Sequence, residues 1–144
     1  IDVLQEIKIE ELGSFRQVSV ITSHTMFHAG EAFGQRIHAS DLVLIDHDDI
    51  FAGMVSLRDV HFDSTDDFIC NLITLEDIMT PNVPCLYPDN NLHEALEILM
   101  GSEFDKVPVI RRDDDTEGHL LGYILYSDVL EKYHDFVKPK NTFT

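Results

Sequence analysis

The sequence reads IDHDDIFAGMVSLRDV over residues 45–60, and it returns to nearly the same pattern as IRRD at residues 110–113 and LGYILYSDV at residues 121–129. Each copy has an apolar strand, an acidic turn and a glycine that opens a second apolar strand. Each copy also carries an aspartate six residues after that glycine, Asp59 in the first and Asp128 in the second. Repeated units that cannot bury their apolar faces alone pack against one another. We therefore expect two related halves about a pseudo-twofold axis, with paired clefts between them.

The repeat extends upstream, where residues 27–33 align with residues 92–98. Alternating and β-branched residues predict strands, which fall at residues 18–21, 42–45, 51–56, 83–86, 107–110 and 120–125. Apolar residues at helical spacing predict helices, which run from Ser23 or His24 to Ile37, from Leu92 to about Gly101, and from Ser127 or Asp128 to about Tyr133. A further short helix is predicted to begin at Asp59. Each half then runs strand, helix, strand, strand, helix, which predicts an α+β fold with a small mixed sheet.

Length and repeat together suggest a division of the chain. We expect residues 1–62 to hold the first repeat with a lead-in, residues 63–74 to be a connector, residues 75–136 to hold the second repeat, and residues 137–144 to be a flexible tail. Each half of about 60 residues is marginal in size, so we expect the halves to share a core. The chain does not begin with methionine, which suggests a piece of a longer protein.

The composition excludes several classes of protein. The formal net charge is −17, which opposes binding to nucleic acid or to anionic lipid, because both need lysine and arginine to neutralise phosphates. Apolar runs are too short to span a bilayer, so no direct bilayer insertion is expected. Cys70 and Cys85 form no metal or redox motif and are interpreted as reduced thiols of a cytoplasmic protein.

Several motifs in order resemble the CBS domain. They are DIMTP at residues 77–81, YPDNNLHEAL at residues 87–96, KVPVI at residues 106–110 and GYILYSDV at residues 122–129, with GMVSLRDV at residues 53–60 resembling the end of a preceding CBS domain. The resemblance implies a tandem CBS pair, the Bateman module, which often dimerises and binds adenine nucleotides such as ATP, ADP or AMP between its repeats. It implies a regulatory role without catalysis.

A finer resemblance concerns the parent protein. Residues 51–60 followed by residues 77–81 are similar to the cytoplasmic C-terminal region of chloride channels and chloride/proton antiporters. This resemblance implies that the chain is the cytosolic part of an integral membrane protein, with the membrane transport domain as its partner and a second copy of itself in a homodimer.

The resemblance also implies where a nucleotide would bind. Asp59 would accept hydrogen bonds from both ribose hydroxyls, since a carboxylate has two acceptor oxygens, and Ser56 would donate to phosphate. The partner segment in the other repeat contains Thr80, Val83 and residues 104–105, so the predicted first cleft consists of Ser56, Asp59, Thr80, Val83, Phe104 and Asp105. Phe104 is predicted either to stack on adenine or to be an ordinary core residue, and Asp59 also suits a helix cap.

The second cleft departs from the pattern. Asp128 is present, but Leu125 stands where the first copy has Ser56, and leucine donates no hydrogen bond to phosphate. The residues predicted for this weaker cleft are Val18, Ser40 and Asp128. We therefore expect one competent cleft and one degraded cleft.

Other chemistry is weakly indicated. His24 and His28 have the spacing of zinc ligands on one helix face, and the acidic turns at residues 46–49 and 113–115 could gather Mg²⁺. Both patterns are more typical of solvated surface, so no metal ligand is assigned, although Mg²⁺ sensing stays open as an alternative, as does a purely dimerising module. No nucleophile and base pair, P-loop or dinucleotide fingerprint is visible, which argues against an enzyme.

Overall fold

The computed structural model describes residues 3–60, 67–112 and 118–138, and of Asp59 and Asp67 it describes the backbone alone. The chain forms helices, 3-10 turns and strands. In order they are α1 (Val3–Glu6), η1 (Ile9–Leu12), β1 (Val20–Thr22), α2 (Phe27–Arg36), β2 (Asp41–Ile45), η2 (His47–Asp49), β3 (Phe51–Ser56), η3 (Leu57–Asp59), α3 (Asp67–Cys70), α4 (Leu75–Ile78), α5 (Leu92–Gly101), β4 (Lys106–Ile110), β5 (Leu120–Leu125) and α6 (Tyr126–Val137).

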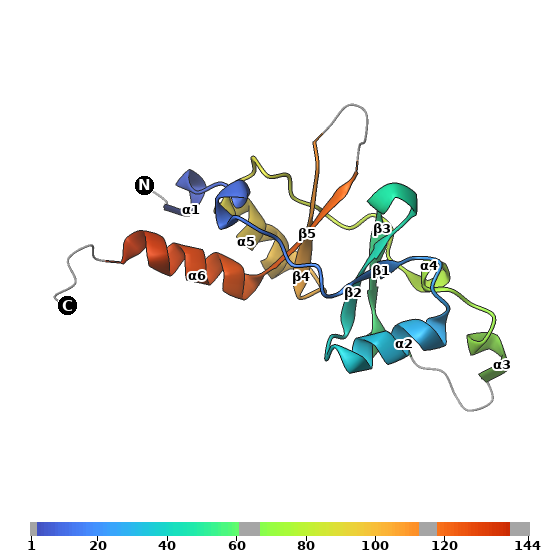
Figure 1. The fold of residues 1–144 in the computed structure, drawn as a ribbon. Helices are drawn as coiled ribbons and strands as arrows, with labels where there is room; N and C mark the ends of the chain where they lie inside the picture. Colours follow the sequence, from blue (N-terminus) through green and yellow to red (C-terminus); the bar gives the residue numbers. More distant parts are fainter. Residues whose placement is uncertain (1–2, 61–66, 113–117, 139–144) are drawn as a thin grey trace.

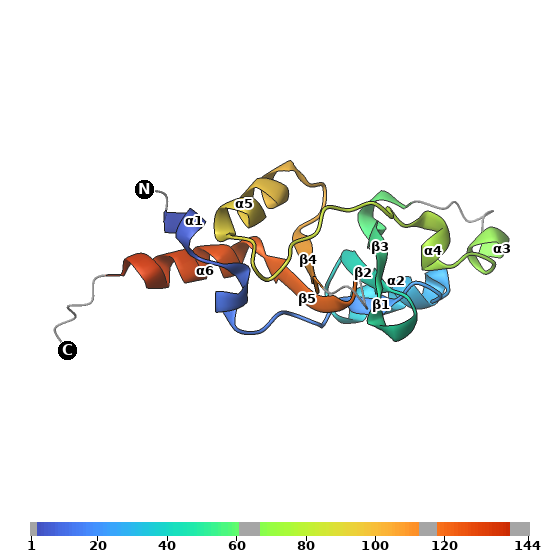
Figure 2. The same cartoon turned by 90° about the horizontal axis from the view of Figure 1, so that it is seen from above.

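The elements gather into two lobes, as Figure 1 shows. One lobe contains β1 to β3 with α2, α3 and α4, and the other contains β4 and β5 with α1, α5 and α6 (Figures 1 and 2). The order β1-β2-β3 forms one sheet and β4-β5 forms the second. The predicted α+β class with two related halves is therefore confirmed.

The two hairpins have matching register. Asp41 pairs with Ser56 at the open end of the β2–β3 hairpin, and Lys106 pairs with Leu125 at the same place in β4–β5. Each hairpin has an irregularity one residue before the end of its first strand. The equivalence of Asp41 with Lys106, and of Ser56 with Leu125, follows from this register.

The prediction of a strand at residues 83–86, as the first strand of the second half, is wrong. The described chain forms only a single parallel bridge there, between Leu86 and Val109, with Leu86 N donating to Pro108 O at 2.9 Å. Pro84 and Pro88 flank this bridge, and proline has no N–H to continue a ladder. In the first half the equivalent strand, β1, pairs with β2 in parallel over three residues.

The helix boundaries also differ from prediction. The first long helix begins at Phe27 rather than at Ser23 or His24, because Ser23 N donates to Ile45 O at 2.8 Å and keeps that segment beside the sheet. The predicted helix starting at Asp59 is instead a 3-10 turn that ends there. The last helix begins at Tyr126 and continues past Tyr133 to Val137. Within the described residues no helix is both long enough and apolar enough to cross a membrane.

The core of each lobe includes a segment that, in the sequence, leads into the other half. Ile7 and Ile9, ahead of the first half, are fully buried in the core of the second lobe with Leu92 and Val107. Leu75, at the start of the second half, is buried in the first lobe among residues that include Phe27, Leu42 and Leu44. Because each leading segment packs in the lobe of the other half, the two halves are held together. The predicted division at residues 62 and 75 stays a prediction.

A third core joins the lobes. Val43 and Met54 of the first sheet pack with Phe104, Leu120 and Tyr123 of the second half, and all five are buried. The molecule is therefore held together by apolar contact between its halves as well as by the packing of each leading segment in the lobe of the other half.

Candidate ligand-binding clefts

The second strand of each hairpin, β3 or β5, contacts the entry segment of the other half, by which we mean the residues around Thr80 or Arg16 that lead into that half. Met54 in β3 exchanges two backbone hydrogen bonds with Thr80, at 3.0 and 2.7 Å. Tyr123 in β5 exchanges two with Arg16, both at 3.0 Å. Thr80 and Arg16 are therefore equivalent positions, and each stands at the entrance of one cleft.

The first cleft is a cavity of about 350 Å³ beside Thr80. The predicted residues Thr80, Val83 and Phe104 all line it. The remaining lining residues come from the same entry segment and from the end of α5, and they are Asn82, Pro84, Ile98, Gly101, Ser102 and Glu103. Three predicted site residues are thus brought together around one space.

The other predicted residues of the first cleft lie next to the cavity or beyond what is described. Ser56 is buried at the end of β3, and its hydroxyl has no hydrogen-bond partner. Asp105 follows Phe104 but does not line the cavity, and its backbone N–H donates to Asp41 Oδ2 at 2.8 Å. Asp59 ends η3, and its side chain lies outside the described part of the structure.

Phe104 belongs to the core as well as to the cavity wall. It is only 6% exposed and packs with Val43, Met54, Leu120 and Tyr123. A ring buried to this extent leaves little of its surface for a ligand. The core interpretation of Phe104 is therefore correct for this state of the protein, while its lining position keeps it within reach of a ligand.

Arg58 reaches the wall of the first cleft from the closing turn of the first half. Its Nη2 donates to Glu103 O at 3.4 Å and lies 3.2 Å from Asp41 Oδ1. About half of the Arg58 side chain is exposed. A cation thus stands beside the cleft in a strongly acidic chain, and it was missed because only the aspartate and serine of that turn were considered.

The carboxylate of Asp128, in the second half, is already hydrogen-bonded to another side chain. The Arg16 guanidinium forms a two-point contact with it, with Nη2 to Oδ1 at 2.7 Å and Nε to Oδ2 at 2.9 Å. Leu125 N also donates to Asp128 Oδ2 at 2.8 Å. The carboxylate oxygens that would hold a ribose are therefore satisfied within the chain.

These contacts shift the ionisation of both partners. Burial raises the pKa of Asp128, but the hydrogen bonds from Arg16 and from the Leu125 backbone outweigh it and leave the pKa below its usual range. The hydrogen bond to Asp128 raises the pKa of Arg16. Arg16 was missed because the partner segment predicted for Asp128 began at Val18.

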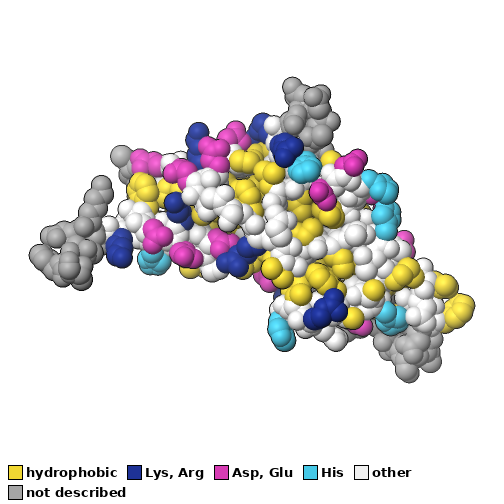
Figure 3. Space-filling view, viewed as in Figure 1, with side chains coloured by type: hydrophobic (Ala, Val, Ile, Leu, Met, Phe, Trp, Pro, Cys, Tyr) yellow, Lys and Arg dark blue, Asp and Glu magenta, His cyan; other side chains and the backbone are white. Residues whose placement is uncertain are grey.

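The residues predicted for the second cleft do not come together. Asp128 lines a cavity of about 220 Å³ with Glu131 and Asp135, while Ser40 lines a different cavity of about 410 Å³ beside Arg58. Val18 is 64% exposed and lines neither. Figure 3 shows acidic side chains gathered over the α1 and α6 end of the molecule. Three carboxylates and one cation, Lys132, line the cavity at Asp128, so the net charge there opposes a phosphate.

A buried polar network between the halves was also missed. Lys106 is 4% exposed, and its Nζ donates to Asp41 O at 2.7 Å and to Ser19 Oγ at 3.3 Å. Tyr123 OH donates to Ser19 Oγ at 3.1 Å. Burial raises the pKa of the Asp41 carboxyl, against the hydrogen bond from Asp105 N and the charge of Arg58. The available signal was a charged residue opening each buried strand, at positions 41 and 106.

Comparison with known proteins defines the class. Residues 75–135 match the family model of the CBS domain. Together with the two related lobes, this match means that the chain contains a CBS domain and has the fold of CBS-pair proteins. The predicted CBS resemblance is thus confirmed at this level.

Particular structures and relatives agree with the fold. CBSX2 in complex with AMP, a protein from Arabidopsis thaliana, superposes with a TM-score of 0.73 at 20% identity, covering 90% of this chain and 98% of that one. The CBS domain of a bacterial CNNM/CorC family Mg²⁺ transporter gives 0.68 at 16%, covering 90% and 76%. None of the proteins named here is a chloride channel.

Curated relatives match over a small part of their length. Inosine-5'-monophosphate dehydrogenase of Thermoplasma acidophilum is 25% identical over 132 residues, which is 92% of this chain and 25% of the relative. The same enzyme of Bifidobacterium longum is 28% identical over 108 residues, 73% of this chain and 19% of the relative. The chain spans a quarter or less of these relatives.

Proposed function

We propose that this chain is a regulatory module that binds an adenine nucleotide in the first cleft and catalyses nothing itself. The observation that carries the proposal is the cavity of about 350 Å³ lined by Thr80, Val83 and Phe104, next to the closing turn of the other half. Small-molecule sites have volumes of about 300–1,000 Å³ and combine apolar walls with a few polar groups. This cavity has both, because the hydroxyls of Thr80 and Ser102 stand among apolar side chains.

Relatives support the choice of ligand. CBSX2, which shares the fold, was solved with AMP bound. Two curated relatives are inosine-5'-monophosphate dehydrogenases, named for a purine nucleotide. The ribose-binding role of Asp59 and the phosphate-binding role of Ser56 rest on the sequence resemblance.

Charge supports the first cleft over the second. The nucleotide phosphate must overcome a net charge of −17, so local donors decide where it binds. Arg58, which is itself paired with Asp41, stands beside the first cleft and donates to Glu103 O. Arg16 is paired with Asp128 in the second cleft, whose cavity is lined by the carboxylates of Glu131 and Asp135 against the single cation of Lys132. The proposed site is therefore single and lies between residues 80–84 and 101–104.

Regulation would follow from the way each half packs against the segment that leads into the other. A nucleotide that bridges the two halves stabilises one relative orientation, in proportion to its different affinity for the two states. An attached domain of a longer parent protein would respond to that orientation. The chloride channel parent predicted from residues 51–60 stays a prediction, as does the cytosolic location, and a Mg²⁺ transporter or a nucleotide-biosynthesis enzyme suits the same module.

Homodimerisation is part of the proposal. Helix α6 carries an apolar stripe at helical spacing in Tyr126, Leu130 and Val137, and each of these side chains is 39 to 48% exposed. Such a stripe on a projecting helix suits a second copy of the chain. Sedimentation of the purified chain measures this directly, and Leu130→Glu is the disrupting variant.

The proposed site is tested by thermal unfolding of the chain with AMP, ADP, ATP, S-adenosylmethionine and Mg²⁺ separately. A ligand at ten times its dissociation constant should add about 1.4 kcal/mol to the free energy of unfolding and raise the melting temperature by a few degrees. Asp59→Ala and Thr80→Val should abolish the shift for the adenine compound that binds. Glu10→Ala is the matched control, because Glu10 is an exposed carboxylate far from the cavity residues in the sequence.

Three results would redirect the interpretation. A nucleotide shift that survives Asp59→Ala and disappears in Asp128→Ala would move the site to the second cleft. A shift with Mg²⁺ alone would favour the ion-sensing alternative. A stable dimer that responds to no ligand would favour the purely dimerising one.

A further inference from the structure

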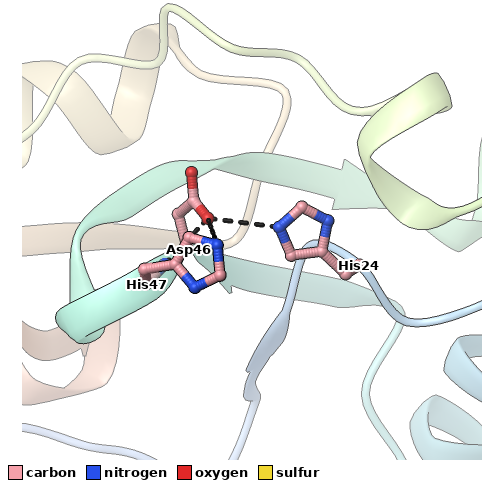
Figure 4. A group of neighbouring side chains, drawn as sticks. All are labelled: His24, Asp46 and His47. Carbon is pink, nitrogen blue, oxygen red and sulfur yellow. Dashed lines mark hydrogen bonds and ion pairs between the residues drawn. The ribbon is translucent and has the colours of Figure 1, made fainter.

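His24, Asp46 and His47 form a group at one edge of the first sheet. Strands β1 and β2 are parallel, and Thr22 lies opposite Ile45 at their carboxyl ends. His24 comes two residues after Thr22, and Asp46 and His47 come directly after Ile45, so the register brings the three side chains together. Figure 4 shows both imidazole rings beside the Asp46 carboxylate.

The distances suit a shared ion. His24 Nε2 lies 3.2 Å from Asp46 Oδ1, and His47 Nε2 lies 3.9 Å from the same oxygen. One ligand atom from each residue lies within 4.8 Å of the others. A tetrahedral ion with bonds of about 2.0–2.1 Å separates its ligands by about 3.3 Å, so the most distant atoms must move closer by up to about 1.5 Å. The side chain of His47 is 87% exposed and free to rotate inward.

The backbone holds the three residues in this arrangement. The Asp46 carboxylate accepts from His47 N at 2.8 Å, and Asp46 N donates to Ile50 O at 2.7 Å. Asp48 and Asp49 have φ values of 59° and 61°, in the left-handed region that aspartate enters more readily than most residues. On the other side, Ser23 N is bonded to Ile45 O at 2.8 Å. Asp46 and His47 therefore lie in a hydrogen-bonded turn, and His24 follows Ser23, which is hydrogen-bonded to the sheet.

Glu76 completes the arrangement behind His24. Its Oε2 lies 3.7 Å from His24 Nδ1, and Glu76 N donates to Ser23 O at 2.9 Å. A metal-binding histidine almost always gives its other ring nitrogen to a carboxylate or carbonyl, which orients the ring. With Nδ1 turned toward Glu76, Nε2 of His24 faces Asp46 and the centre of the group.

We propose that His24, Asp46 and His47 bind a divalent transition metal ion such as Zn²⁺, with Glu76 as the positioning residue. Two imidazoles and one carboxylate favour Zn²⁺ and its neighbours over Mg²⁺, which prefers oxygen ligands. The ion fastens the ends of β1 and β2 together and, through Glu76, ties them to α4. Remaining coordination positions face solvent and take water.

Calorimetric titration of the untagged chain with Zn²⁺, together with the visible absorption of the Co²⁺ form, tests the site. One equivalent should bind, and the Co²⁺ spectrum should be that of a site with nitrogen ligands. His24→Ala and His47→Ala should each weaken binding about tenfold or more, and Glu76→Gln should weaken it by about tenfold. His28→Ala is the matched control, because His28 is a similarly exposed imidazole facing Glu31 on the neighbouring helix.

The outcomes separate the site from general affinity for cations. If His28→Ala weakens Zn²⁺ binding as much as His24→Ala, or if the double variant His24→Ala/His47→Ala still binds one equivalent, the proposal is wrong. Equal competition by Mg²⁺ would also overturn it, because the acidic turn alone would then explain binding. Circular dichroism of each variant shows that the fold is retained, and none of these results depends on nucleotide binding.

Discussion

At the scale of single residues, the pairing of Arg16 with Asp128 distinguishes the second cleft from the first. The equivalent residues of the first cleft are Thr80 and Asp59, and threonine places no cation there. Because the Arg16 contact with Asp128 is bidentate, it satisfies both carboxylate oxygens at once. One substitution between equivalent positions therefore makes the two clefts chemically different.

The Arg16–Asp128 pair has a definite pH dependence. The pKa of folded Asp128 is depressed, so the pair stabilises the fold above the unfolded pKa of about 3.9, and this stability is lost as the pH falls through the folded value. Arg16→Ala should cost about 1 kcal/mol at pH 7, since Arg16 is about half exposed. The cost should shrink at pH 3 and below, and urea unfolding at both pH values measures it.

Arg111→Ala provides the control for that measurement. It removes the same charge from an exposed position in the β4–β5 turn. An equal loss in both variants at pH 7 would assign the effect to the overall charge of the molecule rather than to the Asp128 contact.

At the scale of elements, two glycines allow β3 and β5 to lie close to the entry segment of the other half. A side chain at Gly53 would lie 2.6 Å from Thr80 O, and one at Gly122 would lie 2.7 Å from Arg16 O. Gly122 also has a φ of +143°. These glycines were recognised in the sequence as markers of the repeat. Their role, to admit the entry segment of the other half, depends on a contact that spans more than 25 residues in one case and more than 100 in the other.

Alanine at either glycine should destabilise the fold. In Gly53→Ala and Gly122→Ala the new methyl group meets backbone, which cannot yield, and overpacking of this kind costs about 1–3 kcal/mol. Gly101→Ala, at the end of α5 with open space around it, should be neutral or stabilising by up to about 1 kcal/mol. Chemical denaturation compares the three, and equal effects would mean that this close approach does not need glycine.

At the scale of the whole molecule, polar and apolar contacts join the two halves. Ser19 from the first half and Tyr123 from the second share a buried hydrogen bond beside the Lys106 ammonium, which lies 5.1 Å from the Tyr123 ring centre. The surrounding core contains Val43 and Phe104. We expect the halves to unfold in one transition, because neither keeps a complete core without the other.

Tyr123→Phe tests that connection. It removes the hydroxyl that donates to Ser19 Oγ and accepts from Ser19 N, so a buried donor loses its partner and the expected cost is about 1–3 kcal/mol. Tyr126→Phe, three residues along on an exposed surface, should change stability little. Calorimetry should show a single transition in both variants, and a split transition in the wild type would contradict the shared core.

The sequence by itself determined the two-half architecture, both hairpins, the class of fold and three of the residues that line the first cleft. These features follow from local patterns, namely apolar alternation, turn residues and the spacing of a repeat, which act over a few residues. The strand predicted at residues 83–86 did not form a ladder, because Pro84 lacks an N–H donor and Pro88 follows directly after Tyr87, although the alternation looked suitable.

Only the tertiary structure decided which side chains meet. Arg16 reaches Asp128 across 112 positions in the sequence, Lys106 reaches Asp41 across 65, and His24 meets Asp46 because two parallel strands end together. No local pattern encodes these contacts, since each depends on the register between segments that are brought together by burial of the common core. The Arg16–Asp128 pair of the second cleft and the histidine group at the sheet edge are consequences of that register.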